Sequence, residues 1–265
     1  MAVDQRVLIS EANLRQVGGV STEDGRFVNT GLLFRSGYLS DLSGDSFNLL
    51  QGLELRNMVD LRRPTESQER PHPKLLDCRV HAFSVSEDDN EFAVIANRLG
   101  EPGLSQQAPE MIAQYFAGNI THRLDRYRPV FQFVTNPDHY PLLFNCTAGK
   151  DRTGFVAAIV LRLLGVEESV VVDDFLLSNE VRRAWIDQKF VEFRDRLAQE
   201  SGVAPENLDD DVLAPLRLLL LTQASFIEAV FAAVERQWSS WDVFRRDGLG
   251  IDDAQFSRFQ KSLLV

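Results

Sequence analysis

A cysteine and an arginine, Cys146 and Arg152, are separated by five residues in the segment from Asn145 to Gly154. A short apolar run precedes this segment and a longer one follows it, which predicts a strand, a loop and a buried helix. A loop of this length at a helix N-terminus can turn successive backbone N–H groups inward, where the helix dipole adds about half a positive charge. The sequence therefore predicts a nest for a phosphate-sized dianion.

The side chains of this segment suit such a nest. An anion nest favours the thiolate form of Cys146, and the thiolate is the nucleophilic form of a cysteine. The planar guanidinium of Arg152 can bind two phosphoryl oxygens and stays charged at any working pH. Thr153 can donate its hydroxyl to the sulfur, while Gly149 and Gly154 suit a tight loop and close helix packing. We therefore expect a nucleophilic cysteine facing a phosphate-binding arginine.

The elements that position this loop follow from the apolar pattern. Short β-prone runs predict strands at 32–34, 57–61, 79–85 and 141–144. Helix-like or loop stretches separate three of them, and this alternation is typical of a parallel sheet with helices on its faces. We therefore expect a single α/β domain over residues 1–265, with a mostly parallel central sheet of about four to five strands.

Helices are predicted throughout the second half of the chain. The run 155–166 is apolar on every side, as expected of a helix buried between the sheet and an outer layer. Further helices are expected at 168–177, 181–197 and 211–238, and a last one begins near Asp252 and ends at Leu264. The segment 179–235 either packs on the core or forms a helical lid over the site.

Composition limits the partners and the compartment. The 265 residues are 44% hydrophobic and 25% charged, as in globular proteins, and the net charge of −11 argues against nucleic acid or an anionic membrane as a partner. Two cysteines cannot build a disulfide framework, and they lack zinc-ligand spacing. The start of the chain lacks the pattern of a secretory signal, and no apolar run reaches the ~20 residues of a membrane span. We expect a cytoplasmic protein without a metal and without stable membrane insertion.

The loop Asn-Cys-Thr-Ala-Gly-Lys-Asp-Arg-Thr-Gly differs at one residue from the loop His-Cys-x-x-Gly-Lys-Asp-Arg-Thr-Gly of the bacterial and fungal tyrosine phosphatase-like proteins. The chain resembles this branch of the cysteine phosphatases over nearly its whole length. The further matching pieces are Asn13-Leu14-Arg15, Gly18-Gly19, Phe34-Arg35-Ser36-Gly37, Val59-Asp60-Leu61-Arg62, Glu66, Asp174-Phe175-Leu176-Leu177-Ser178-Asn179 and Gly248-Leu249-Gly250.

The resemblance implies a phosphoric monoester hydrolase that works through a phospho-cysteine intermediate and needs no cofactor. Cys146 would attack phosphorus while Arg152 and the loop amides hold the phosphoryl oxygens. The implied phosphate-binding residues are Thr147, Ala148, Gly149, Lys150, Asp151 and Arg152. The implied partner is a phosphorylated protein, with phosphotyrosine before phosphoserine and phosphothreonine, or in second place a phosphoinositide.

The leaving oxygen needs a proton from a general acid. In this family branch the implied donor is the loop aspartate, here Asp151, and Lys150 beside it adds positive charge near the phosphoryl group. Asp60, at a predicted strand end, is an alternative acid or else a structural ion-pair site. Asp88 and Asp89 are further alternatives, although their acidic run fits a solvated loop equally well.

Several other residues leave two interpretations open. Arg35 and Arg62 can brace the site or bind substrate, or else form salt bridges at the edge of the sheet. Cys78 fits a buried apolar thiol better than a disulfide partner of Cys146. Four histidines show no ligand-like spacing: His72, His81, His122 and His139.

Asn145 stands where the family has histidine. Asparagine can donate a hydrogen bond but cannot carry a positive charge, so we expect a smaller thiolate fraction at Cys146 and slower turnover. A phosphate-binding pseudophosphatase is therefore one alternative. Sulfur transferases and arsenate reductases also place a cysteine at the start of an anion loop, but the stretch Gly-Lys-Asp-Arg-Thr-Gly speaks against both.

Overall fold

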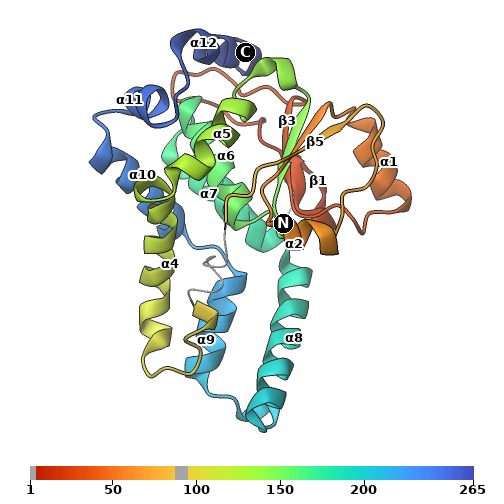
Figure 1. The fold of residues 1–265 in the computed structure, drawn as a ribbon, viewed down its shortest axis with the longest axis vertical. Helices are drawn as coiled ribbons and strands as arrows, with labels where there is room; N and C mark the ends of the chain where they lie inside the picture. Colours follow the sequence, from red (N-terminus) through yellow and green to blue (C-terminus); the bar gives the residue numbers. More distant parts are fainter. Residues whose placement is uncertain (1–3, 87–94) are drawn as a thin grey trace.

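The computed structural model describes residues 4–86 and 95–265, and its centre is a six-stranded mixed sheet with the strand order β1-β2-β3-β6-β4-β5 (Figure 1). The strands are β1 (Val7–Ile9), β2 (Leu14–Gln16), β3 (Leu33–Ser36), β4 (Asn57–Asp60), β5 (Arg79–Ala82) and β6 (Leu142–Asn145). The last four in this list run parallel, which confirms the single, mostly parallel α/β domain. The antiparallel strands β1 and β2 were not predicted, because three residues each are too few for a visible alternation.

Strand β6 lies inside the sheet, and all four of its residues are buried. Leu142 and Phe144 face the larger core, which includes the helix after β6, whereas Leu143 faces a smaller core. This two-sided burial explains the continuous apolar run, which is typical of parallel sheets covered on both faces. The strand ends at Asn145, which pairs with Ser36 of β3 and Asp60 of β4. The next residue is therefore placed at the carboxyl edge of the sheet, where ligands bind in such folds.

Helices cover both faces of the sheet, with most of them on one side and α1 on the other (Figure 1). They are α1 (Gly44–Gly52), α2 (Pro64–Glu69), α4 (Leu104–Thr121), α5 (Leu124–Val134), α6 (Asp151–Leu163), α7 (Glu168–Val181), α8 (Arg183–Ser201), α9 (Asp210–Leu220), α10 (Ala224–Gln237), α11 (Trp241–Val243) and α12 (Asp253–Leu263). Short 3-10 turns η1 (Ser10–Ala12), η2 (Pro137–His139) and η3 (Pro205–Asn207) and the π-helical turn η4 (Phe244–Gly248) complete the described elements. Helix α12 begins after Asp252, whose carboxylate accepts from the backbone N–H of Gln255 at 2.7 Å, as an N-cap does.

Helix α6 is the buried apolar helix that the sequence predicts, but it begins at Asp151, directly after the loop. Its close packing on α7 requires Gly154, because a Cβ there would lie 2.7 Å from the ring of Phe175. Gly165, at φ +82°, lies just beyond its end and fits a left-handed helix terminus. The loop is therefore clamped between a central strand and a fully packed helix.

The predicted helix 211–238 is wrong in one respect, because it is broken into α9 and α10. At the break, the backbone N–H of Thr222 donates to Oδ1 of Asn179 at 2.8 Å, and Asn179 Nδ2 donates to the Thr222 carbonyl at 2.9 Å. These bonds to α7 replace helical ones and turn the chain. Among the described residues no single helix has the length and apolar composition of a membrane span, and α9 and α10 pass that test only as a pair bent by 62°.

Candidate active site

Residues 146–152, here called the phosphate loop, connect β6 to α6. Three successive carbonyl groups of the loop accept hydrogen bonds from the surrounding protein. The backbone N–H of Tyr38 donates to Thr147 at 3.0 Å, Asn13 Nδ2 donates to Ala148 at 3.2 Å and to Gly149 at 3.0 Å, and Arg35 Nη2 donates to Gly149 at 3.0 Å. In a trans peptide the next N–H points the opposite way. The amides of residues 148–150 therefore point into the loop and form an anion nest.

Glycine is needed at position 149 for two reasons. Its φ of +69° lies in the left-handed region, and a Cβ would lie 2.4 Å from the backbone nitrogen of Gly37. Gly37 meets the loop from the other side, since its own Cβ would lie 2.9 Å from the Thr147 carbonyl oxygen. The loop and the end of β3 thus touch backbone to backbone, which fixes the direction of the amides.

Cys146 follows β6 and lies at the bottom of a cavity of about 330 Å³, where only 2% of its surface is exposed. The cavity is lined by Arg63, Glu66, Cys146, Thr147, Ala148, Lys150, Asp151, Arg152, Trp185, Lys189, Phe193, Leu219 and Leu220. Cys146, residues of the nest and Arg152 therefore line one cavity.

A carboxylate that the sequence reasoning gave no role, Glu66, holds the guanidinium of Arg152. Nη1 and Nη2 of Arg152 donate to the two carboxylate oxygens at 2.9 and 2.8 Å, and Nη1 also donates to Ser86 Oγ at 3.2 Å. The hydroxyl of Thr147 donates to the same carboxylate. Burial alone would raise the pKa of Glu66, but the Arg152 hydrogen bonds and charge outweigh it and hold that pKa below its usual range. The paired geometry fixes the plane of the guanidinium.

Arg35 braces the phosphate loop from behind, as one of the two interpretations of this residue expected. Its Nη1 lies 2.6 Å from Asp174 Oδ2, and Arg6 and Arg15 reach the other oxygen at 3.1 and 3.4 Å. Burial raises the pKa of Asp174, but the three arginine charges lower it further than burial raises it. Burial also lowers the pKa of Arg35 to about 9. Asp174 stood among the matching sequence pieces, yet only the fold reveals that it is the carboxylate shared by these three arginines.

Asp60 and Arg62 form a buried ion pair next to the loop. Arg62 Nε and Nη2 donate to the two oxygens of Asp60 at 2.8 and 2.9 Å, while Ser67 and His72 lie within 2.9 Å of its second oxygen. Burial raises the pKa of Asp60, but hydrogen bonds from His72 and Arg62 hold it below its usual range. An ionised, fully paired carboxylate is a poor proton donor, and Asp60 does not line the cavity. Its position fits the structural interpretation.

Asp151, the expected general acid, is the first residue of α6 and lines the cavity. Lys150 lines the cavity too. Its Nζ lies 3.3 Å from Asp151 Oδ2 and donates to the carbonyls of Leu219 and Leu221 at 2.8 and 3.0 Å, at the end of α9. Its charge therefore also stabilises a helix terminus, where cations are favoured, and its role beside the phosphoryl group stays a prediction.

Two further sequence expectations concern Thr153 and Asn145, on either side of the phosphate loop. Thr153 Oγ1 donates to the Ser36 carbonyl at 3.5 Å, whereas we expected it to donate to the sulfur. Asn145 Nδ2 donates to the Cys146 carbonyl at 3.3 Å, and its buried Oδ1 has no hydrogen-bond partner in the described part of the chain. Asp88 and Asp89 lie outside the described residues.

The side of the cavity facing the loop is here called the roof: Trp185, Lys189 and Phe193 of α8 and Leu219 and Leu220 of α9. Both helices project from the body of the molecule, and α9 lies between α4 and α8 (Figure 1). The segment 179–235 thus contributes one wall of the site, and its movement as a lid stays a prediction. Cys78 is a free, half-buried thiol whose pKa burial raises to about 11.

The comparisons with known proteins agree with this geometry. A model of the tyrosine phosphatase family matches residues 8–265. A Cupriavidus necator protein assigned as a tyrosine-protein phosphatase is 34% identical over 248 residues, 92% of this chain and 84% of that protein. The triple specificity protein phosphatase PtpB of Mycobacterium tuberculosis is 27% identical over 287 residues, 95% of this chain and 96% of PtpB.

Among solved structures, the catalytic core of the S. cerevisiae PP-IP phosphatase SIW14 aligns with 70% of this chain and 93% of its own, at 17% identity and a TM-score of 0.34. The family model covers nearly the entire sequence, and the Cupriavidus relative is similar along most of both chains. This chain therefore belongs to the tyrosine phosphatase family and is a cysteine phosphatase.

Proposed function

We propose that the protein hydrolyses phosphoric monoesters through a phosphocysteine at Cys146, and that its main substrates carry phosphotyrosine. The observation that carries this proposal is the enclosure of Cys146 with three inward amides and the Glu66-oriented fork of Arg152 in one cavity. These groups supply donors to the equatorial oxygens of a phosphoryl group, where charge accumulates in the transition state.

The reaction proceeds in two displacements. The Cys146 thiolate attacks phosphorus in line, the bond from phosphorus to the substrate oxygen breaks, and Asp151 gives its proton to that oxygen. Asp151, now ionised, accepts a proton from a water molecule that attacks the phosphocysteine. The sulfur–phosphorus bond breaks, which releases inorganic phosphate and restores the thiolate.

The roof favours an aromatic phosphate ester. Trp185, Phe193 and the two leucines of α9 give the cavity an apolar wall opposite the loop, and an aromatic ring packs well against such a surface. Lys150, Arg152 and Lys189 also line the cavity, and their charges keep a phosphoinositide in second place. Phosphoserine and phosphothreonine lack the ring, and we place them and phosphoinositides after phosphotyrosine.

A panel of substrates tests this proposal. Phosphotyrosine and phosphothreonine peptides and a short-chain phosphoinositide are assayed with the wild type, Cys146→Ser and Asp151→Asn, with Cys78→Ser as a matched cysteine control. We expect the phosphotyrosine peptide to have the highest kcat/KM, Cys146→Ser to be inactive and Cys78→Ser to match the wild type. Asp151→Asn should lose about 10²- to 10⁴-fold on a peptide and less on an aryl phosphate with a good leaving group. Equal loss on both esters would place the acid elsewhere.

Asn145 favours a second candidate, a phosphate-binding pseudophosphatase. Its buried Oδ1 has no partner among the described residues, so it contributes one donor to the Cys146 carbonyl and no positive charge. The variant Asn145→His separates the two candidates. For an enzyme slowed by this asparagine, the substitution raises an already measurable kcat. For a pseudophosphatase, the wild type binds phosphate without turnover.

A further inference from the structure

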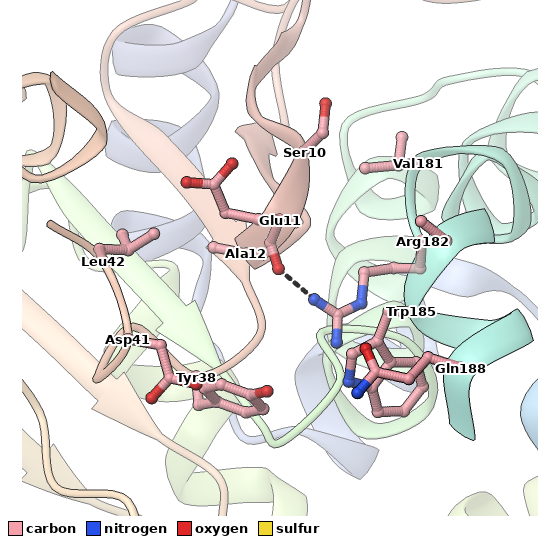
Figure 2. A pocket seen from close by; sticks show the side chains of 11 residues that line it. Ser10, Glu11, Ala12, Tyr38, Asp41, Leu42, Val181, Arg182, Trp185 and Gln188 are labelled. Atoms are coloured by element: carbon pink, nitrogen blue, oxygen red, sulfur yellow. Dashed lines mark hydrogen bonds between the residues drawn. The ribbon is translucent and has the colours of Figure 1, made fainter. Parts of the chain in front are cut away.

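A second cavity, of about 480 Å³, lies beside the catalytic one (Figure 2). Trp185 lines both cavities, so the indole forms part of the boundary between them. Tyr38 lines the second cavity from the opposite side, and its backbone N–H donates to the Thr147 carbonyl of the phosphate loop. A substrate bound at Cys146 therefore has this cavity next to it.

The second cavity contains a buried arginine, Arg182, which directs its guanidinium between η1 and Tyr38 (Figure 2). Only 3% of this residue is exposed. Its Nη1 donates to the carbonyl of Glu11, its guanidinium stacks 4.3 Å from the Trp185 ring and the Tyr38 side chain lies beside it, whereas Nε and Nη2 are buried with no hydrogen-bond partner within 3.5 Å among the described residues. Burial lowers the pKa of Arg182, and the neighbouring Tyr38 and Cys146 offset this only in part.

The other fully buried arginines have carboxylate partners. Arg15 and Arg35 pair with Asp174, Arg62 with Asp60, and Arg245 with Asp242 and Asp253. Within residues 4–86 and 95–265, no carboxylate lies within 4.0 Å of Arg182. The indole N–H of Trp185 is likewise buried without an acceptor there. Buried polar groups normally have hydrogen-bond partners. The unpaired N–H groups of Arg182 and Trp185 at this cavity therefore indicate that a ligand supplies the acceptor.

We propose that Arg182 binds the carboxylate of an acidic residue flanking the phosphotyrosine of a peptide substrate. A carboxylate matches the fork of a guanidinium. Glu11 and Asp41 already line the same cavity, so a single negative charge is tolerated there better than a second phosphoryl dianion. This inference rests on the proposed phosphotyrosine activity and names Arg182 as the residue that selects the sequence around it.

The test compares phosphotyrosine peptides whose flanking residues are all alanine with peptides that carry one glutamate at each flanking position in turn. The readout is the ratio of kcat/KM between the best glutamate peptide and the alanine peptide, measured within each variant. A general loss of activity or folded fraction cancels in this ratio. Arg183→Gln is the matched control, because Arg183 is the neighbouring exposed arginine and its substitution removes the same charge.

For the wild type we expect a ratio of about 10, in line with a charge-assisted hydrogen bond. Arg182→Gln should reduce the ratio to about 1, Arg182→Lys should keep part of it, and Arg183→Gln should leave it unchanged. A wild-type ratio near 1, or an equal reduction in Arg183→Gln, would overturn the proposal. The proposal would also be overturned if a doubly phosphorylated peptide, or a bisphosphorylated inositol headgroup, gained more kcat/KM from Arg182 than the glutamate peptide does. If the wild type hydrolyses no phosphotyrosine peptide, the proposed function itself fails.

Discussion

The two sides of the catalytic cavity differ in how firmly they are held. Behind the phosphate loop, Arg15 and Arg35 are fully buried and share one counter-charge, Asp174, which is 2% exposed. Across the cavity, α8 has 19 residues and buries only Ile186 and Ala198. A buried, hydrogen-bonded network resists local opening, whereas a helix with little buried surface opens at a lower free-energy cost.

This difference assigns separate tasks to the two sides. The chemistry depends on amides and a guanidinium that hold their positions, and the buried network behind the loop supplies that rigidity. We expect access and choice of substrate to depend on the roof, because α8 buries little surface. Substitutions behind the loop should therefore lower the rate of the chemical step or the free energy of unfolding. Substitutions in the roof should change mainly the affinity for substrate and the mobility of α8 and α9.

The largest expected effect belongs to Arg152, which lines the same cavity as Cys146. Arg152→Lys keeps a positive charge but removes the fork that Glu66 orients. We expect kcat/KM for an aryl phosphate to fall by about 10³-fold or more. A steady-state assay measures it, and a loss below about tenfold would show that the planar geometry is unimportant.

The next effect concerns stability behind the loop. Asp174→Asn leaves Arg15 and Arg35 buried without their counter-charge, so we expect the free energy of unfolding to drop by about 3–5 kcal/mol. Urea denaturation measures the drop. Asp173→Asn, in the adjacent position of α7, is the control and should cost little. Equal effects for the two variants would remove the special role of Asp174.

The buried carboxylates around the site set the pH dependence of stability. Asp60, Glu66 and Asp174 have pKa values in the folded state below their ordinary values. The unfolded chain therefore binds more protons as the pH falls, so stability is complete above roughly pH 5 and decreases below about pH 4. Denaturation curves between pH 7 and pH 3 follow this decrease, and a protein that becomes more stable toward pH 3 would contradict it.

A smaller effect is expected at the residue that orients Arg152. Glu66→Gln keeps the shape of the side chain but weakens both hydrogen bonds to the guanidinium. We expect kcat to fall by roughly 10- to 100-fold while the fold is retained. Adding Glu66→Gln to Arg152→Lys should then cause little further loss, because both act on one interaction. If the losses of kcat in the two single variants add up in the double variant, Glu66 and Arg152 act independently.

The smallest effect is expected in the roof. Lys150→Met removes the hydrogen bonds to the carbonyls of Leu219 and Leu221 while filling the same space. Hydrogen exchange in α9 should become faster, whereas kcat for an aryl phosphate should change by less than about tenfold. Lys189→Met, in the roof but without those bonds, should leave exchange in α9 unchanged. A loss of kcat as large as in Arg152→Lys would place Lys150 in the chemical step.

Much of the site follows from local sequence, because the loop is one continuous segment. Cys146, Arg152 and the strand–loop–helix arrangement depend on neighbouring residues, and the apolar runs on either side identify them. The parallel sheet was predictable for the same reason. The bonds of Lys150 to Leu219 and Leu221 could not be predicted, because these partners lie about 70 residues later in the chain.

Residues that act across the sheet could not be assigned from sequence. Glu66 and Asp174 stood in matching pieces of the family pattern, but a carboxylate shows no role until its arginine partners are placed in space. Asp60 illustrates the opposite case. As a carboxylate at a strand end it fits catalysis on sequence grounds, and only its bonds to Arg62 and His72 favour a structural role.

The most direct test of the account is to trap the intermediate. Wild-type protein is mixed with an aryl phosphate, quenched with acid within the first turnover, and analysed by intact and peptide mass spectrometry. We predict one phosphoryl group on the peptide that contains Cys146, absent in Cys146→Ser. Turnover without any phosphoryl group on Cys146, or full activity in Cys146→Ser, would contradict the account.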